Sequence, residues 1–193
     1  YRSNLFSASL HYRDYSAKFR SPYGYNFGES ATPSNEQGLY FGILYKVAKD
    51  VSIESYFDIY RTHTRTYTVQ MPVSGRDWCG RAFFDNTLFG NLMLKLKSET
   101  KTDGYKASSS SAQTIFDITR DEIRLEAKRS ISEKVAARAR LDFAYIDFDK
   151  VKPGEVGWAG FIELEYKPLK NLRVKARTSV FATDSYSSAI WHF

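Results

Sequence analysis

Three histidines and a few serines are the residues whose types could support catalysis or metal binding in this 193-residue chain. His11, His63 and His192 lie far apart, without the HxH or HExxH spacing that brings two imidazoles to one metal ion. His63 and Ser74 fall in one expected loop, but no third residue is spaced to orient them as a base and its nucleophile. We therefore expect no catalytic residue, no metal site, no cofactor and no enzyme activity.

Two groups of carboxylates are spaced for other chemistry. Asp142, Asp147 and Asp149 gather near one expected strand end, where oxygen ligands could hold Ca²⁺, although a solvated strand end is the simpler interpretation. Glu54 and Asp58 share one strand face and could serve acid–base catalysis. We expect them instead to pair with Arg and Lys from other strands, because charges that face inward need partners or water.

Basic residues at every second position are the strongest functional candidates. The stretches are VAARARLDF at 135–143 and LRVKARTSVF at 172–181. They could form a positive wall that attracts an anionic solute or a nucleic-acid backbone. They could also form a cross-strand ladder with acidic residues, which we favour because neighbouring strands carry opposite signs.

The candidate site is this charged face as a whole, which we expect to line the lumen of a barrel. Its residues are Glu54, Asp58, Arg124, Glu126, Lys128, Arg138, Arg140, Asp142, Glu163, Glu165, Arg173, Lys175 and Arg177.

Alternation of apolar and polar residues predicts a chain made of β-strands only. Aromatic residues are 16% of the composition, with 14 Tyr and 14 Phe, which suits a pleated and half-exposed surface. The alternation predicts nine strands, at 4–15, 38–47, 51–61, 77–84, 89–99, 119–129, 135–146, 157–167 and 172–183. The connections between them alternate short and long, which is typical of an up-and-down antiparallel meander with tight turns at one end.

The surroundings of the apolar face are the main question, because a lipid-facing barrel, a soluble barrel and a β-sandwich all give two-faced strands. No run of 18 apolar residues exists to make a membrane helix. Charged residues lie in mid-strand on the polar face, and aromatic residues gather toward strand ends at Tyr12, Tyr45, Tyr60, Tyr145, Trp158 and Tyr166. Both features favour a bilayer around the apolar face.

Short motifs add a resemblance to a known family. The residues GES at 28–30, NEQGLY at 35–40 and YFDIY at 56–60 resemble the outer-membrane β-barrel region of bacterial helix-hairpin-helix domain-containing proteins. This resemblance implies a bacterial outer-membrane location and an upstream DNA-binding region in the full protein. The glycine-rich hairpins of such a region are absent from these 193 residues.

The sequence therefore predicts an all-β, antiparallel transmembrane β-barrel or part of one, with about nine to ten strands. We expect residues 1–193 to form one module, as a fragment of a longer barrel; YSSAIWHF at 186–193 is the alternative, a tenth and closing strand. The expected function is non-enzymatic, structural or transport-type, with a charged and partly basic lumen. The expected partners are the lipid bilayer and, in the full-length protein, an anionic solute or DNA. The alternative is a soluble ligand-binding β-barrel or β-sandwich.

Overall fold

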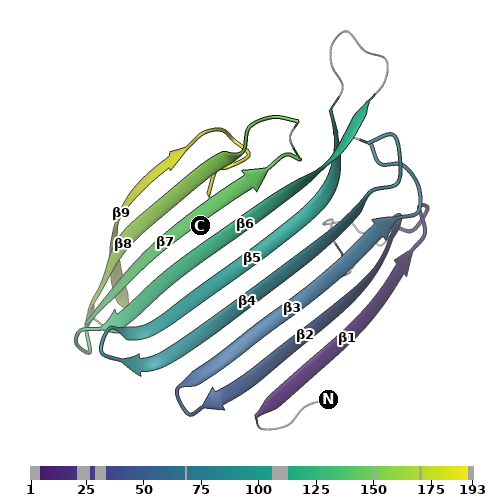
Figure 1. Cartoon of the computed structure of the whole chain (residues 1–193). Helices are drawn as coiled ribbons and strands as arrows, with labels where there is room; N and C mark the ends of the chain where they lie inside the picture. Colours follow the sequence, from purple (N-terminus) through teal and green to yellow (C-terminus); the bar gives the residue numbers. More distant parts are fainter. Residues whose placement is uncertain are drawn as a thin grey trace.

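Nine antiparallel strands form a single sheet in which every strand pairs with its neighbours in the chain (Figure 1). The structure is a computed structural model that describes residues 5–20, 27–28, 34–67, 69–105, 113–149, 151–169 and 171–190. Its strands are β1 (Phe6–Tyr15), β2 (Glu36–Ala48), β3 (Val51–Thr62), β4 (Ser74–Thr87), β5 (Gly90–Tyr105), β6 (Thr114–Ser130), β7 (Val135–Asp147), β8 (Glu155–Leu169) and β9 (Leu172–Thr183). The predicted meander is confirmed. The sheet is not closed, because β1 and β9 are its two edges and do not pair.

The strands extend further toward the long connections than the sequence predicts. Residues 100–118 were expected to be loop, but β5 continues to Tyr105 and β6 begins at Thr114. The prediction was wrong here because it followed apolar alternation. On β5 the face that carries Leu92, Leu94 and Leu96 continues with Ser98, Thr100 and Thr102, which keep the strand but not the apolar signal.

Sharp turns at the short-connection end depend on residues that tolerate a left-handed backbone. Gly90, which opens β5, has a φ of 91°, and Asn86 near the end of β4 has a φ of 56°. The register shifts between Phe84 and Thr87, so a bulge precedes this turn. A Cβ at Gly90 would collide with the backbone carbonyl oxygen of Lys128 on β6, which cannot move away as a side chain could.

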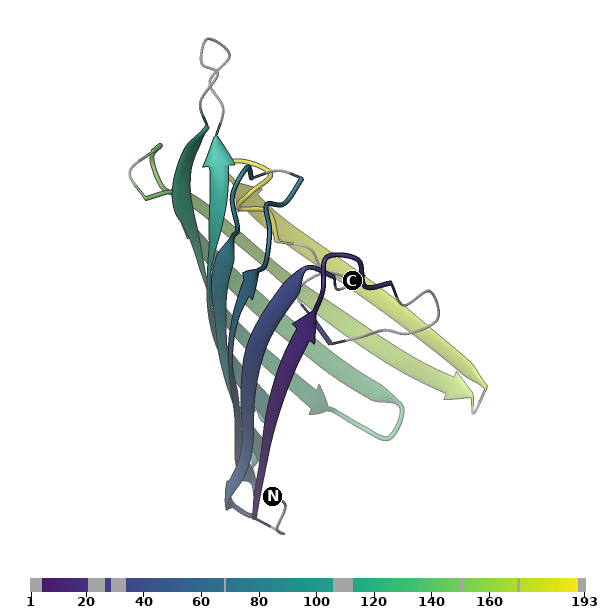
Figure 2. The same cartoon turned by 90° about the vertical axis from the view of Figure 1, so that its right-hand side faces the viewer.

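The sheet is strongly curved, and its two faces have opposite chemistry. Figure 2 shows the curvature, with the segment that follows β9 on the concave side. This segment contacts Arg120, so Arg120 lies on the concave face. The register places most of the other charged residues on the same face as Arg120. The convex face carries the large exposed apolar residues of every strand.

The burial of side chains is inverted relative to a soluble sheet. Large apolar residues of the convex face are exposed on all nine strands; examples are Leu10 at 67%, Phe41 at 45%, Leu125 at 51% and Ile162 at 61%. The buried side chains of the strands lie on the concave face, and they include charged ones. The largest buried apolar cluster among the described residues is small, with Ala144, Ile146 and Phe148 at its centre.

Five of the six aromatic residues that the sequence places toward strand ends are exposed on the convex face; they are Tyr12, Tyr45, Tyr145, Trp158 and Tyr166.

Tyr60, the sixth of these aromatic residues, does not share the exposed face, so grouping it with the other five was wrong. It is buried on the concave face, because it has the same parity as Asp58 on β3. Its ring lies over Gly75 on β4, where a Cβ would collide with it.

Replacement of Gly90 by Ala tests the turn. We expect Gly90→Ala to lower the free energy of unfolding by about 1–2 kcal/mol. An alanine is strained in the left-handed backbone conformation, and its Cβ collides with the carbonyl oxygen of Lys128. Denaturant unfolding of the chain folded in detergent micelles, followed by tryptophan fluorescence, measures the change. Ser130→Ala, at the same end of the sheet, is the control and should be nearly neutral; a neutral Gly90→Ala would contradict this account of the turn.

Candidate functional site: the charged concave face

All thirteen predicted site residues lie on the concave face. The register places them there in cross-strand rows; in one such row Glu54 faces Arg81 on β4, Arg81 faces Lys95 on β5 and Lys95 faces Arg124 on β6. Opposite charges meet at the two ends of this row, Glu54 with Arg81 and Arg124 with Asp142 on β7. Arg81, Lys95 and Arg124 are like charges in direct opposition, and Lys95 reaches diagonally to Glu122 on β6 instead.

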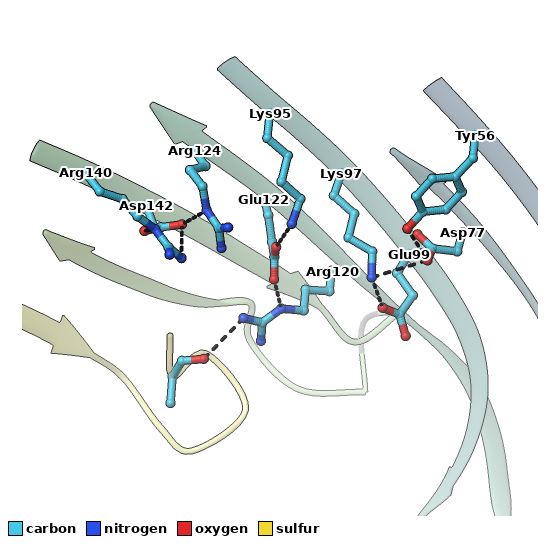
Figure 3. A network of polar contacts seen from close by, with 11 residues as sticks. Tyr56, Asp77, Lys95, Lys97, Glu99, Arg120, Glu122, Arg124, Arg140 and Asp142 are labelled. Atoms are coloured by element: carbon cyan, nitrogen blue, oxygen red, sulfur yellow. Dashed lines mark hydrogen bonds and ion pairs between the residues drawn. The ribbon is translucent and has the colours of Figure 1, made fainter. Parts of the chain in front are cut away.

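One part of the ladder centres on Asp142 of β7, whose carboxylate is buried (Figure 3). Arg124 donates to it from β6 at 2.5 Å, and Arg140 donates to it from β7 at 2.6 Å. Arg138 makes a bidentate contact with Glu126 at 2.9 and 2.8 Å. Fork-shaped guanidinium contacts of this kind fix geometry as well as charge.

A second part joins β8 and β9. Arg177 donates to Glu163 at 2.9 and 2.6 Å, while Lys175 lies 3.5 Å from Glu163 and 3.4 Å from Glu165. Arg173 lies 3.4 Å from Glu165. The guanidinium of Arg177 also stacks over the ring of Phe161, 4.3 Å from its centroid. Cations outnumber carboxylates in this part, so the ladder leaves a local positive excess.

A third group of the concave face was missed by the sequence analysis (Figure 3). Lys97 on β5 lies 2.8 Å from Glu99 and 3.3 Å from Asp77 on β4, and the hydroxyl of Tyr56 donates to Asp77 at 2.9 Å. Next to it, Glu122 accepts hydrogen bonds from Lys95 and Arg120 at 3.1 and 2.8 Å. The other oxygen of Asp77 is buried and has no hydrogen-bond partner among the described residues.

The most deeply buried ion pairs join β1 to β2 and β3. The side chain of Arg13 is only 2% exposed and donates to Glu36 at 2.5 Å and to Asp58 at 2.7 and 3.1 Å. To reach Asp58 it crosses β2 above Gly38. A Cβ at Gly38 would lie 2.5 Å from the guanidinium carbon, so glycine is what leaves the path open.

The segment that follows β9 folds onto the concave face. Arg120 donates to the backbone oxygens of Ser187 at 2.6 Å and Ala189 at 3.2 Å. Ser188 is fully buried against Gly157, which leaves no room there for a Cβ. Residues 186–190 are therefore not a tenth strand beside β9, and residues 191–193 lie outside the described residues.

The other residues that could do chemistry are not brought together. His63 contacts Asp14 at 2.8 Å, and no contact joins it to Ser74 within the described part of the chain. Asp142 faces the concave side, whereas Asp147 has the opposite parity on β7 and is exposed. No group of three metal-ligating side chains gathers among the described residues, and His192 is outside them.

A parity signal could have identified the missed residues. Arg120 and Glu122 alternate in step with Arg124 on β6, and Glu36 alternates in step with Tyr40 on β2. The apolar alternation of this strand begins at residue 38 and so does not reach Glu36, and nothing in the alternation of β1 distinguishes Arg13. Only the folded structure shows that the side chain of Arg13 passes over Gly38 to reach Asp58, two strands away.

No family model, no curated protein and no solved structure matches this chain. The resemblance to the barrel region of helix-hairpin-helix domain-containing proteins therefore stays a prediction. No helix in the described residues is long and apolar enough to cross a membrane.

Removal of Arg13 tests the buried ion pairs. We expect Arg13→Met to lower the free energy of unfolding by about 3–5 kcal/mol, because it leaves two buried carboxylates without their cation. Urea unfolding in micelles is the measurement. The triple variant Arg13→Met, Glu36→Gln, Asp58→Asn should recover a large part of that loss, and failure to recover it would show that the charges are not the cause.

Removal of Arg120 tests how the segment 184–190 is held. We expect Arg120→Gln to raise amide hydrogen exchange in this segment at least tenfold, because two hydrogen bonds to its backbone are lost. Arg129→Gln is the matched control, since Arg129 donates to a backbone oxygen, that of Leu88, at the other end of the sheet. Equal exchange in Arg120→Gln and the unchanged protein would mean that other contacts hold the segment.

Proposed function

We propose that this chain forms part of the wall of a non-enzymatic β-barrel in the bacterial outer membrane, structural or transport-type, with a charged lumen on the concave side. The observation that carries the proposal is the inverted burial. Apolar side chains of all nine strands are exposed on the convex face, while Arg13, Glu36, Asp58, Asp142 and Glu163 are buried on the concave face. A bilayer is the solvent in which such an apolar surface is stable.

A soluble barrel or sandwich is the second candidate, and it fits this geometry less well. In both soluble folds the apolar face points inward and is covered, by its own closed barrel or by a second sheet. The curvature here places the apolar face on the outside, where no other part of the described chain covers it. Soluble monomers rarely expose contiguous apolar patches larger than a few hundred Å².

The directions of the edge strands support a wall that further strands complete. With nine antiparallel strands, β1 and β9 run in the same direction. If they paired directly, the closing pair would be parallel. An odd number of additional strands gives an antiparallel closure and the even total that is usual in bacterial barrels.

The chemistry of the lumen follows from the ladder. Most charges of the concave face are paired, so a wide interior would offer water-filled space with a mild positive field near β7 to β9 rather than a uniform positive wall. This arrangement supports a preference for anionic solutes. In channel recordings with a salt gradient, a reversal potential that favours cations would contradict that preference.

The family resemblance implies DNA binding by the full-length protein. The described residues do not support a DNA-binding surface on the concave face, since most of its cations are paired with carboxylates. We attribute no enzyme activity to this face for the same reason. Its carboxylates serve as ion-pair partners and not as free acids or bases.

Two neighbouring substitutions on β5 test the membrane assignment. Leu94 lies on the convex face and Met93 on the concave face. We expect Leu94→Arg to destabilise the protein folded in lipid vesicles by about 2–4 kcal/mol, because it places a guanidinium in hydrocarbon. Met93→Arg adds the same charge on the water-filled side, so it should change stability much less.

The stability of both variants is measured by denaturant unfolding in vesicles, with heat-modifiable migration on a gel as a check of folding. If water surrounded the convex face, Leu94→Arg would place its guanidinium in water and change the stability little, so it would not be more destabilising than Met93→Arg. A chain that is monomeric in plain buffer without detergent would overturn the proposed function.

A further inference from the structure

A hollow on the convex face lies where the apolar rows end, near the long connections. Its volume is about 700 Å³, and it spans β1 to β6. Its apolar wall includes Tyr12, Leu39 and Ile59, and two arginines, Arg61 and Arg76, lie on the same face. The hollow therefore has an apolar side that continues the apolar rows and a cationic side beyond them.

The two arginines occupy diagonal positions on neighbouring strands. Arg76 on β4 faces Ile59 on β3, and Arg61 lies two residues further along β3. Positions related in this diagonal way are about 7–8 Å apart on one sheet face. Both side chains can therefore reach a single headgroup.

Neither of these arginines has a carboxylate partner among the described residues, unlike most cations of the concave face. Within the described part of the chain, the side chain of Arg61 donates only to the amide oxygen of Gln37, at 3.1 and 3.0 Å. Gln37 in turn donates to the hydroxyl of Tyr12 at 2.7 Å, which holds its amide oxygen toward Arg61. The one carboxylate in the hollow, Asp117 on β6, accepts a hydrogen bond from Thr102 at 3.1 Å and lies two strands away from Arg76.

Arginines at the polar end of an apolar wall suit an amphiphile whose head is anionic. Arg binds phosphate oxygens with its planar fork of N–H donors, and acyl chains pack on aliphatic and aromatic side chains. Below the hollow, the apolar rows continue along the strands with Phe41 and Phe57, which are both exposed.

We propose that this hollow is a binding site for a lipid with a phosphate headgroup in the membrane leaflet at the long-connection end, with the phosphate on Arg61 and Arg76 and the acyl chains along Leu39 and Ile59. The site rests on the proposed function, because only a membrane protein meets this ligand with its convex face. It adds a specific lipid to what would otherwise be a general apolar surface.

Lipid titration of the whole chain in detergent micelles tests the site. The probe is dioleoyl phosphatidic acid, with dioleoyl phosphatidylcholine as the comparison, and native mass spectrometry gives the dissociation constant of each. We expect the double variant Arg61→Gln, Arg76→Gln to bind phosphatidic acid at least tenfold more weakly and phosphatidylcholine about equally well. The matched control, Arg173→Gln with Lys175→Gln, removes the same charge from the concave face and should change neither constant.

Unchanged binding of phosphatidic acid by the Arg61, Arg76 variant overturns the site. An equal loss of binding by the control variant overturns it as well. Neither outcome affects the proposed function, which the comparison of Leu94→Arg with Met93→Arg tests separately. A chain that is monomeric in buffer without detergent overturns the proposed function and the site together. If the double variant does not fold, Arg76→Gln alone is measured. It should weaken phosphatidic acid binding at least threefold, and unchanged binding by that folded variant also overturns the site.

Discussion

The separation of most charged side chains from the exposed apolar ones, onto opposite faces of the sheet, is the constraint on which the rest of this structure depends. Side chains alternate with a period of two along a strand, so a slip of one residue would exchange the faces of a whole strand. A slip of β6 would move Arg124 to the apolar side and Leu125 to the charged side. In a bilayer each arginine placed in hydrocarbon costs about 2–4 kcal/mol, so a slipped register is strongly disfavoured.

The ion pairs across strands specify the register more than they add stability. Removing charges from water costs free energy that their mutual attraction only partly returns, so a paired charge contributes little net while an unpaired buried one is costly. Removal of Arg13 would give the costly case, because it would leave Glu36 and Asp58 buried without a cation. The exposed cation Lys175 illustrates the other case, since solvent screens its contacts with Glu163 and Glu165. The network is therefore deeply buried near β1 to β3 and open to solvent near β9.

The sequence predicted the features that depend on alternation alone. The nine strands and the common face of the thirteen charged residues follow from a period of two, and the order of the strands follows from the alternation of short and long connections. The length of β5 and β6 did not follow, because the apolar signal stops at Leu96 while the strand continues. The reach of Arg13 over Gly38 and the inward path of residues 184–190 depend on curvature and on gaps between side chains, and neither leaves a periodic trace. A period of two does not reveal whether lipid or protein surrounds the apolar face. The exposure of that face in the structure is what favours lipid.

The uneven distribution of charge near β9 has a physical explanation in the proposed barrel. Every residue of β9 is exposed, whereas β7 and β8 alternate buried and open positions. Its cations find carboxylates only on the β8 side, because the other side is a sheet edge with unpaired backbone groups. The segment that follows β9 turns onto the concave face and leaves this edge open. A strand that pairs with β9 would satisfy its backbone groups, and acidic residues on the inward face of that strand would complete the ladder on Arg173 and Lys175. The positive excess of the concave face would then be a property of the edge, and the anion preference of the finished barrel would depend on the strand that stands next to β9.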